Sequence, residues 1–327
     1  MERSYFIKLK PLNTFYFGSI KGFDEKNTEY FLKSGIYPQQ TAVLGMLRKK
    51  ILEDNDCLVP EKLRTQEHRK KEKEYIGEIK ANIEDSNFGK IHSLSSIQIY
   101  KKDVPYIFSY SGIDFLGSSF LTNKGDKNLA NYDAKNFQGK PRKDKDDAEE
   151  ILKATVDIGI KKLSKNDAGF FKKQRYSFLD KDFYFGFYAT LSEELKLKNG
   201  IVQIGDKYSI FYMEVKESEM EEKAFSICNI ENSIFFMSDA YFYQEDLEEI
   251  LRESKGMLLQ NNKFKFISRE GHKYKVQEKI KNLLGRGSIL FLGQDNNEKV
   301  LKILQDKKYE NYKKIGLNDY KFIGGNI

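Results

Sequence analysis

The amino-acid sequence predicts an α+β protein of about two domains, and three observations support this prediction. The chain has 327 residues, more than a single domain commonly contains. Residues 4–52 follow the pattern of a strand, a loop and a helix, and residues 288–325 follow that of a strand, a helix and a second strand. Between these units the apolar runs are short and rich in aromatic residues, which is typical of strands.

The first unit rests on two periodicities. Residues 4–10, SYFIKLK, alternate apolar and other side chains with the period of a half-buried strand, so Tyr5, Ile7 and Leu9 are expected to face the core. In residues 37–52, YPQQTAVLGMLRKKIL, apolar side chains recur at helical spacing, and Pro38 suits a first helical turn. The apolar positions of this helix are Val43, Leu44, Leu47 and Ile51.

Further elements follow from the same patterns. A segment at 117–150 is poor in aliphatic residues and is predicted to be a long excursion from the fold. The chain closes with a βαβ unit at 288–293, 297–308 and 320–325. The other predicted elements are a polar helix or basic linker at 61–84, two strands within 95–110 that turn at Lys102 and Asp103, a strand at 183–191, a hairpin of 201–204 and 208–215, strands at 233–237 and 263–267, and an acidic helix at 245–253.

The net charge is mildly basic, and the charges are segregated. Lys and Arg number 56 against 49 Asp and Glu, a formal net charge of +7, and the sequence pI is about 8.9. One surface can therefore meet phosphate groups while another meets a basic protein. The basic segments are 62–73, 139–145 and 172–175, and the acidic ones are 217–222 and 245–253.

The composition excludes several classes of protein. A hydrophobic fraction of 39% and an aromatic fraction of 14% are too high for a disordered chain. Cys57 and Cys228 are the only cysteines, which rules out a disulfide framework and fits a reducing compartment. The N-terminus lacks an apolar signal core, and no apolar run approaches the roughly 20 residues of a membrane-spanning helix. We therefore expect a cytoplasmic protein without a membrane partner.

Motifs for enzymatic chemistry are sparse. GRGS at 285–288 precedes a strand rather than a helix, so it is not a phosphate-binding loop of the P-loop or dinucleotide kind. His68, His92 and His272 have no second metal ligand at a binding spacing. No metal, cofactor or small-molecule substrate is expected. An arginine between two glycines can still approach a sugar-phosphate backbone, although an ordinary turn is the simpler interpretation of these four residues alone.

Five segments taken together resemble a known family. In order along the chain they are KPLNTFYFG at 10–18, GIYPQQTAVLGMLRKKIL at 35–52, VDIGI at 156–160, GFFKKQRYSF at 169–178 and GRGSILFLG at 285–293. This series resembles the Cmr-type RAMP subunit of type III-B CRISPR effector complexes, the subunit that caps the five-prime end of the guide RNA.

The resemblance implies a fold and a set of partners. The fold would be two ferredoxin-like domains related to the RNA-recognition fold: an N-terminal RAMP domain at 1–195, with an inserted segment at about 85–150, and a C-terminal domain at 196–327 with the glycine-rich loop. The protein would be a non-catalytic RNA-binding subunit in antiviral defence. It would hold the five-prime handle of the crRNA and contact the large polymerase-like subunit and a backbone RAMP subunit.

The resemblance also implies an RNA-binding site. By position, Thr41, Gly45 and Arg48 match the handle-contacting helix of the family, and Gly285, Gly287 and Ser288 match its glycine-rich loop. Glycine within a helix costs roughly 1 kcal/mol relative to alanine. Gly45 is therefore expected to make room either for an RNA backbone or for a close-packed strand. The cations expected to pair with phosphates are Arg48, Lys49, Arg175 and Arg286.

Two other functions fit the sequence. A metal-independent endoribonuclease that processes precursor crRNA would need a general acid and a general base. For that task the sequence offers His68 and tyrosines. A purely structural assembly subunit would instead dock a basic partner on the acidic segments 217–222 and 245–253.

Overall fold

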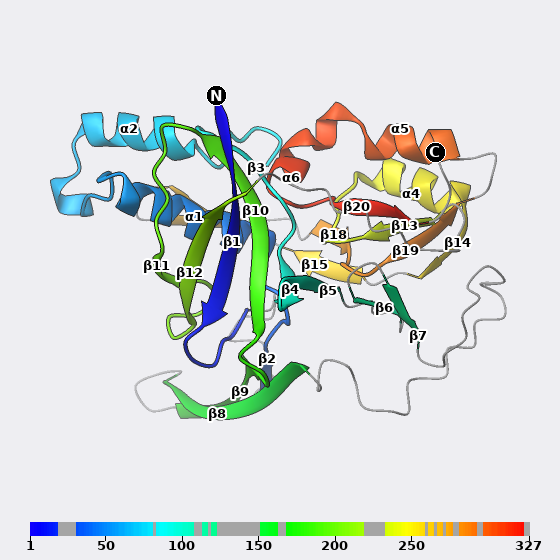
Figure 1. Ribbon diagram of the computed structural model, residues 1–327, viewed down its shortest axis with the longest axis horizontal. Helices are drawn as coiled ribbons and strands as arrows, with labels where there is room; N and C mark the ends of the chain where they lie inside the picture. Colours follow the sequence, from blue (N-terminus) through cyan, green and yellow to red (C-terminus); the bar gives the residue numbers. More distant parts are fainter. Residues whose placement is uncertain are drawn as a thin grey trace.

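Two large antiparallel sheets packed with helices form the body of the protein in the computed structural model (Figure 1). This is a mixed α and β architecture, as the predicted α+β class requires. The residues that the structure describes are 1–18, 31–80, 83–107, 113–116, 119–122, 151–162, 168–218, 233–258, 261–264, 267–270, 273–276, 281–292 and 297–323.

The first sheet is built around β1 (Glu2–Pro11), which lies between β10 and β12 and runs antiparallel to both. The strand order is β11-β12-β1-β10-β4-β5-β6-β7, and β3 also pairs with β10. The alternation predicted for β1 is confirmed, since Ile7 and Leu9 are fully buried and Tyr5 is nearly so. The other strands of the sheet are β3 (Ile91–Leu94), β4 (Gln98–Lys101), β5 (Val104–Ile107), β6 (Ile113–Leu116), β7 (Ser119–Thr122), β10 (Phe183–Ser192), β11 (Gly200–Gln203) and β12 (Ile210–Glu217).

Two turns predicted from the sequence are confirmed. β4 and β5 meet at Lys102 and Asp103, whose φ angles of 49° and 67° are left-handed, as a tight hairpin turn needs. β11 and β12 meet near Gly205, which has a φ of 97°. A Cβ atom at Gly205 would lie 2.3 Å from the carbonyl oxygen of Tyr16, so this turn requires glycine.

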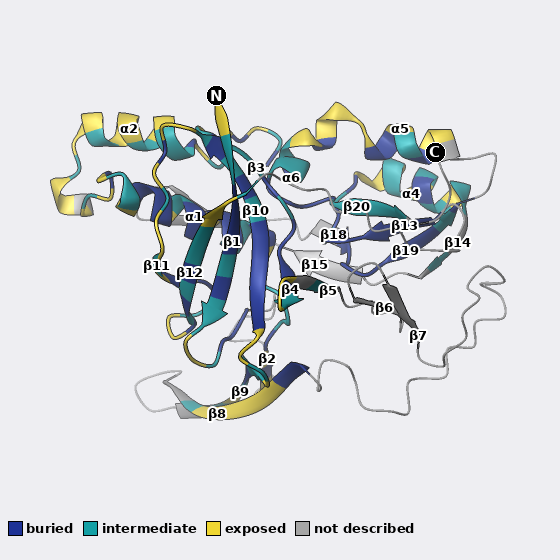
Figure 2. Ribbon diagram, in the orientation of Figure 1, coloured by how far each residue is buried: buried dark blue, intermediate teal, exposed yellow. Residues whose placement is uncertain are grey.

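The helix predicted at 37–52 is α1 (Gln40–Asp54), and its apolar stripe is buried as expected: Val43, Leu44, Leu47 and Ile51. Gln39 precedes the helix without a capping side chain, so Thr41 lies inside the first turn rather than at the cap. The predicted polar helix follows as α2 (Gln66–Ile76), after a short 3-10 turn, η1 (Glu61–Leu63). α2 contains no buried residue and lies beside α1, where Figure 2 shows it largely exposed.

The second sheet has the order β14-β19-β13-β20, and all its neighbouring strands are antiparallel. α4 and α5 lie side by side on one face of it (Figure 1). The predicted C-terminal strand, helix and strand are β19, α5 and β20, with β13 paired between the two strands. The bounds are β13 (Ser233–Phe236), α4 (Gln244–Glu253), β14 (Ser254–Leu258), β19 (Ile289–Leu292), α5 (Asn297–Leu304), η3 (Lys307–Tyr309), α6 (Glu310–Lys314) and β20 (Tyr320–Ile323).

Three smaller sheets complete the described part of the chain. β8 (Leu152–Lys162) and β9 (Ala168–Phe178) form a long hairpin, and β2 (Phe31–Lys33) pairs with β9 in parallel. This three-stranded hairpin sheet lies at the lower end of the first sheet in Figure 1. The two-stranded ladders are β15 (Asn261–Phe264) with β18 (Lys281–Leu284) and β16 (Ile267–Glu270) with β17 (Lys273–Val276). Apart from β7, the excursion predicted at 117–150 lies almost wholly outside the described residues.

The strand pairing indicates which residues belong to each of the two structural units. β11 and β12 follow the predicted domain boundary at 195/196, yet they belong to the same sheet as β1. No helix occurs in the described residues 193–209, which connect β10 with β12. By sheet membership, the first unit therefore extends to Glu217 and the second begins at Ser233.

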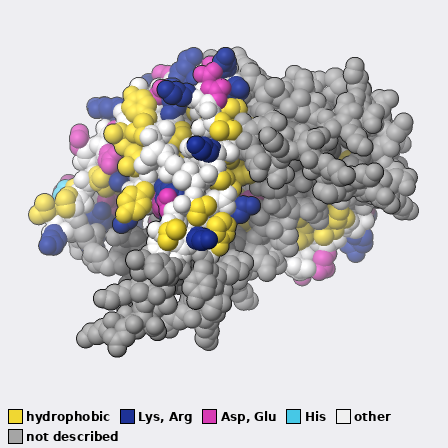
Figure 3. All heavy atoms as spheres, turned by 90° about the horizontal axis from the view of Figure 1, so that it is seen from below, with side chains coloured by type: hydrophobic (Ala, Val, Ile, Leu, Met, Phe, Trp, Pro, Cys, Tyr) yellow, Lys and Arg dark blue, Asp and Glu magenta, His cyan; other side chains and the backbone are white. Residues whose placement is uncertain are grey.

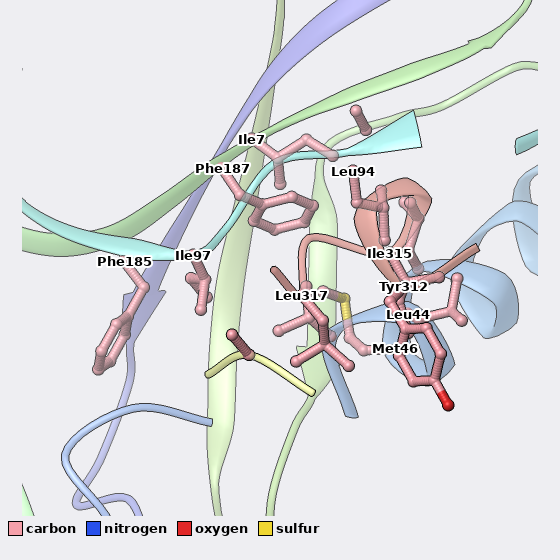
Figure 4. Close-up of a cluster of buried hydrophobic side chains, with 14 of the residues drawn as sticks. Ile7, Leu44, Met46, Leu94, Ile97, Phe185, Phe187, Tyr312, Ile315 and Leu317 are labelled. Atoms are coloured by element: carbon pink, nitrogen blue, oxygen red, sulfur yellow. The ribbon is translucent and has the colours of Figure 1, made fainter. Parts of the chain in front are cut away.

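The second unit supplies part of the core of the first. α6 and the residues that follow it place Tyr312, Ile315 and Leu317 against Leu44 and Leu94 (Figure 4). Gly316 allows this close approach, because a Cβ atom there would lie 2.5 Å from both Gln40 Nε2 and Ser95 O. The two units therefore share one continuous core.

Shortening a side chain in this shared core tests whether the units unfold together. Leu317 is 4% exposed, so we expect Leu317→Ala to lower the free energy of unfolding by about 2–5 kcal/mol. Urea denaturation, followed by far-ultraviolet circular dichroism and by tyrosine fluorescence, should show one transition that shifts equally for both probes. Leu63→Ala, at a position 68% exposed, is the control and should leave the midpoint nearly unchanged. Two separate transitions, with only one shifted, would contradict the shared core.

Candidate nucleic-acid interface

Three of the predicted RNA-binding residues share an exposed stripe of α1. Thr41 is partly exposed, whereas Gly45 and Lys49 are exposed, and the three follow one another at intervals of four residues. A Cβ atom at Gly45 would meet no atom within 4 Å in the described part of the chain. The close-packed strand considered as an alternative for Gly45 is thus not among the described elements. The α1 stripe, Thr41, Gly45 and Lys49, is open to a ligand.

Arg48 lies one position outside this stripe and is occupied within the protein. Its Nε donates to the carbonyl of Ile76 at 3.0 Å, and its Nη2 donates to that of Gly77 at 3.0 Å. These carbonyls are at the C-terminal end of α2, where helical partners are missing and the helix dipole favours a cation. Burial lowers the pKa of Arg48 to about 10, against the opposing effect of Glu72. Arg48 therefore caps α2 and joins it to α1.

Arg175, on β9, joins the hairpin sheet to the first sheet. Its side chain is 4% exposed and makes a two-pronged contact with Asp206, through Nη1 at 2.6 Å and Nη2 at 3.3 Å. The same guanidinium donates to Oγ1 and to the backbone carbonyl of Thr14, at 2.9 and 2.8 Å. Because Thr14 and Asp206 lie in connections next to β1 and β12, Arg175 holds the base of the hairpin in place.

The Asp206 carboxylate accepts hydrogen bonds from several side chains, and its negative charge helps to hold the hairpin in place. We call this set of contacts the hairpin anchor. Lys173 Nζ lies 2.5 Å from Oδ2, and the Ser209 hydroxyl donates to Oδ1 at 2.6 Å. Partial burial raises the pKa of Asp206, but the hydrogen bonds from Arg175, Lys173 and Ser209 outweigh it and lower the pKa to about 2. The carboxylate therefore stays charged well into the acidic range.

The glycine-rich turn at 285–288 is buried between the two units. Gly287 has a φ of 83°, and its N–H donates to the carbonyl of Phe236, while Ser288 Oγ donates to the carbonyl of Gly285. Arg286 is 6% exposed and reaches into the first unit. Its Nη1 donates to the Ile97 carbonyl at 2.6 Å and to Gln98 Oε1 at 2.8 Å.

Arg286 also stacks on an aromatic ring. Its guanidinium carbon lies 3.9 Å from the centre of the Tyr37 ring, so both its edge and its face are in contact with the first unit. The structure therefore does not bring the nine predicted site residues together. Thr41, Gly45 and Lys49 form an open stripe, whereas Arg48, Arg175 and Arg286 join parts of the fold.

A second exposed surface lies on the hairpin sheet, which contains the basic segment 172–175 and the segments 156–160 and 169–178. Phe31, Lys172 and Ile158 are register partners across β2, β9 and β8, so their side chains share one face. Ile158 is 71% exposed, Val156 is 49% exposed, and Lys33 and Lys172 are also exposed. Figure 2 shows the exposed length of β8. We call these residues the hairpin face: Phe31, Lys33, Val156, Ile158 and Lys172.

The sequence contains a signal for this face. Apolar Ala154, Val156 and Ile158 alternate with polar residues, which predicts a strand but normally a buried one. Their exposure instead marks an apolar surface that also carries Lys33 and Lys172, and exposed apolar surfaces are typical of contacts with another molecule. In the view from below, Figure 3 shows lysine and arginine side chains interspersed with hydrophobic ones over the described part of the molecule.

The candidate catalytic histidine has a local structural role. His68 is the third residue of α2, and its Nδ1 accepts from the backbone N–H of Thr65 at 3.2 Å. Thr65 Oγ1 in turn accepts from the backbone N–H of His68, which completes a capping box. Within the described residues, no group of three His, Cys, Asp or Glu side chains could hold a metal ion. The helices of that part of the chain are likewise too short or too polar to span a membrane.

Comparison with known proteins supports the architecture. No family model matches the chain, and no curated protein matches its sequence. A chain in the cryo-EM structure of type III-B Cmr-beta bound to cognate target RNA is similar, with a TM-score of 0.59, 15% identity and coverage of 98% of each chain. A chain in the structure of type III-B Cmr-beta bound to cognate target RNA and AMPPnP, state 1, has a TM-score of 0.58, 14% identity and coverage of 97% of this chain and 98% of that one. At this identity the likeness establishes a shared fold.

Removing the cap that Arg48 provides should loosen α2. We expect Arg48→Ala to lower the free energy of unfolding by about 1–3 kcal/mol, because two helix carbonyls lose a charged donor. Hydrogen exchange should accelerate in the last turn of α2. Lys49→Ala, whose side chain is 61% exposed, is the matched control and should change neither measurement appreciably. Equal effects of the two variants would refute the capping role.

The low pKa of Asp206 predicts how the hairpin anchor depends on pH. Asp206 has a pKa of about 2 in the folded state and of about 4 in the unfolded state. Its ionised carboxylate therefore stabilises the folded protein fully above pH 4, and this stabilisation is lost as the pH falls through 2. Urea midpoints measured at pH 6, 4, 3 and 2 should therefore fall more steeply below pH 4 in the wild type than in Asp206→Asn. Parallel pH profiles for the two proteins would show that Asp206 does not carry this dependence.

Proposed function

We propose that this chain is the RNA-binding subunit of a type III-B CRISPR effector complex and holds the five-prime handle of the crRNA. The observation that carries the proposal is the structural likeness over 98% of both chains to a subunit of type III-B Cmr-beta bound to cognate target RNA. The five sequence segments that resemble the family lie at distinct places in this fold. They include α1, both strands of the hairpin and the turn before β19.

We further propose that both units are variants of the ferredoxin-like fold. In chain order, β13, α4, β14, β19, α5 and β20 form two strand-helix-strand halves, and their sheet order is β14-β19-β13-β20. Four neighbouring strands of the first sheet, β12-β1-β10-β4, follow the same order. With the strands of each unit numbered one to four along the chain, both sheets have the order 4-1-3-2. α1 follows β1 as the first helix of that fold does. No helix occurs in the described residues 193–209 between β10 and β12, and α6 of the second unit packs beside β3.

The RNA would lie along the exposed surfaces rather than on the buried arginines. Gly45 leaves open space on α1, and Lys49, one turn further along, offers an ammonium group to a phosphate. The hairpin face adds Lys33 and Lys172, beside apolar side chains on which bases can rest. Arg48, Arg175 and Arg286 would act indirectly, by fixing the elements that present these surfaces.

The remaining parts of the proposal concern partners and chemistry. We propose that the large polymerase-like subunit and a backbone subunit bind the same chain, and that the protein serves cytoplasmic antiviral defence. Glu245 and Glu248 on α4 are exposed and offer an acidic surface to such a partner. We propose that the chain is non-catalytic. The use of His68 Nδ1 in a capping box supports this over the endoribonuclease alternative.

The α1 stripe gives a direct test of RNA binding. The assay is binding of a synthetic RNA that carries the repeat-derived handle, by the assembled complex and by the full chain. Gly45→Val should weaken binding because it fills the open space, while the fold tolerates valine there. Lys49→Gln should reduce the slope of log affinity against log salt by about 0.7, the value for one phosphate contact on a single strand.

Two variants serve as controls for this test. Gly45→Ala adds only a methyl group and should raise stability by about 1 kcal/mol with a smaller effect on binding. Lys216→Gln removes an exposed lysine on β12, away from the α1 stripe, and should leave the salt slope unchanged. RNA binding that is unaffected by both Gly45→Val and Lys49→Gln would remove the stripe from the site. Specific cleavage of repeat RNA in EDTA that His68→Ala abolishes would instead favour the endoribonuclease.

A further inference from the structure

A cavity between α1 and the edge of the first sheet lies directly beside the α1 stripe. Its volume is about 230 Å³, and α1 contributes Met46, Lys49, Lys50 and Glu53 to its lining. The opposite wall comes from the β11–β12 hairpin: Ile201, Val202, Gln203, Lys207 and Ile210. Lys49 belongs both to the stripe and to this cavity, so a chain lying along the stripe reaches the cavity within one helical turn.

The walls combine apolar and positively charged groups. Met46, Val202 and Ile210 provide an apolar floor, of which Val202 is 7% exposed and Met46 5% exposed. Lys50 is bound to Asp54 at 2.5 Å, with both side chains less than a tenth exposed, so its charge is already compensated. Lys49 and Lys207 are exposed at the rim. Lys49 Nζ lies 3.9 Å from Glu53 Oε1, the one carboxylate of the lining, but this pair is solvated and weak because the two side chains are 61% and 38% exposed.

The rim groups suit a nucleotide. Contact with Tyr208 raises the pKa of Lys207, and its Nζ lies 4.6 Å from the centre of that ring, so a cation and an exposed aromatic ring adjoin the opening. Gln203 donates Nε2 to the carbonyl of Asp206 at 3.2 Å, which orients its amide. Its Oε1 accepts no hydrogen bond within the described part of the chain and can receive one from a base amino group.

The size of the cavity limits the ligand. It lies below the roughly 300–1,000 Å³ of sites that enclose a whole drug-sized molecule, so it suits one planar group rather than an entire cofactor. A nucleobase fits such a space while its phosphate remains outside, beside Lys49 and Lys207. An acidic peptide is the competing occupant, and the test below distinguishes it from a nucleotide.

We propose that this cavity holds the base of one splayed-out nucleotide of the RNA strand that lies along the α1 stripe, a site that rests on the proposed RNA-binding function. Lys49 and Lys207 would hold the flanking phosphates, and the Gln203 amide would contact the base edge. The site would thereby set the register of the RNA on this subunit, because a single base is fixed while its neighbours contact only the surface.

The test is an abasic scan of the synthetic handle RNA. Each nucleotide in turn is replaced by an abasic one, and the affinity for the full chain and for the assembled complex is measured. One position should lose about tenfold, as expected for one base removed from an apolar site. Gln203→Trp fills the cavity from the exposed edge strand, so in this variant the same abasic replacement should cause no further loss of affinity. Lys207→Gln should weaken the binding of every RNA in the scan by the same factor.

The controls separate the possible failures. Lys216→Gln should reproduce the wild-type scan, and unchanged thermal midpoints show that the variants remain folded. Handle RNA that binds with a flat abasic scan would overturn the cavity proposal while leaving the RNA-binding function intact. Absence of RNA binding by the wild-type complex would overturn both. A variant that loses a protein subunit from the complex, but not RNA, would assign the cavity to a peptide and refute the proposal.

Discussion

The burial of Arg286 is the interaction on which the arrangement of the two units depends. A guanidinium removed from water is strongly destabilising unless its donors are satisfied. Here Nη1 donates to Ile97 and Gln98 of the first unit, and the flat face of the group lies on Tyr37. These acceptors and this ring therefore hold the turn that carries Arg286 against the first unit. Gly316, which follows α6, approaches Gln40 and Ser95, and Gln40 in turn accepts from the Ile97 N–H, so a second set of contacts joins the two units beside Arg286.

Arg48 and Arg175 follow the same principle at other joints of the molecule. Arg48 binds the carbonyl end of α2, a helix whose only packing on the core comes from partly buried side chains such as Tyr75 and Ile76, so the cap adds to a limited packing contact. Arg175 ties a hairpin with an exposed face to Asp206. A planar group with five donors suits these joints, since it can bind several acceptors on different elements at once. Two exposed elements, α2 and the hairpin, are thus held by arginines.

Much of the fold was predictable from the sequence, because period and turn chemistry are local properties. The alternation in β1, the apolar stripe of α1 and the turns at Lys102 and Gly205 all follow from neighbouring residues. The roles of the arginines were not predictable in this way. An arginine beside glycine has the same local pattern whether it contacts a phosphate or a backbone carbonyl. The choice depends on which acceptors the distant chain brings within reach, as Ile76 and Ile97 do here.

Among the predicted site residues, this division of roles leaves an exposed lysine, Lys49, and no exposed arginine for the proposed contact with RNA. The ammonium group of lysine is stable in water on its flexible side chain and can move with a mobile phosphate. The planar guanidinium of arginine instead binds most strongly when it makes two fixed hydrogen bonds at once. Lys49, Lys172 and Lys207 are exposed, and each lies on an element that an arginine holds in place. Arg48 is the neighbour of Lys49 on α1. Arg175 joins the hairpin, which carries Lys172, to the turn that carries Lys207. On the proposed RNA-binding function, a substitution at either arginine should therefore reduce RNA affinity only as far as it displaces these lysines. For this reason the RNA affinity lost on Arg175→Ala should be recovered when another cross-link between the hairpin and the first sheet restores the position of the hairpin, even though the guanidinium is absent.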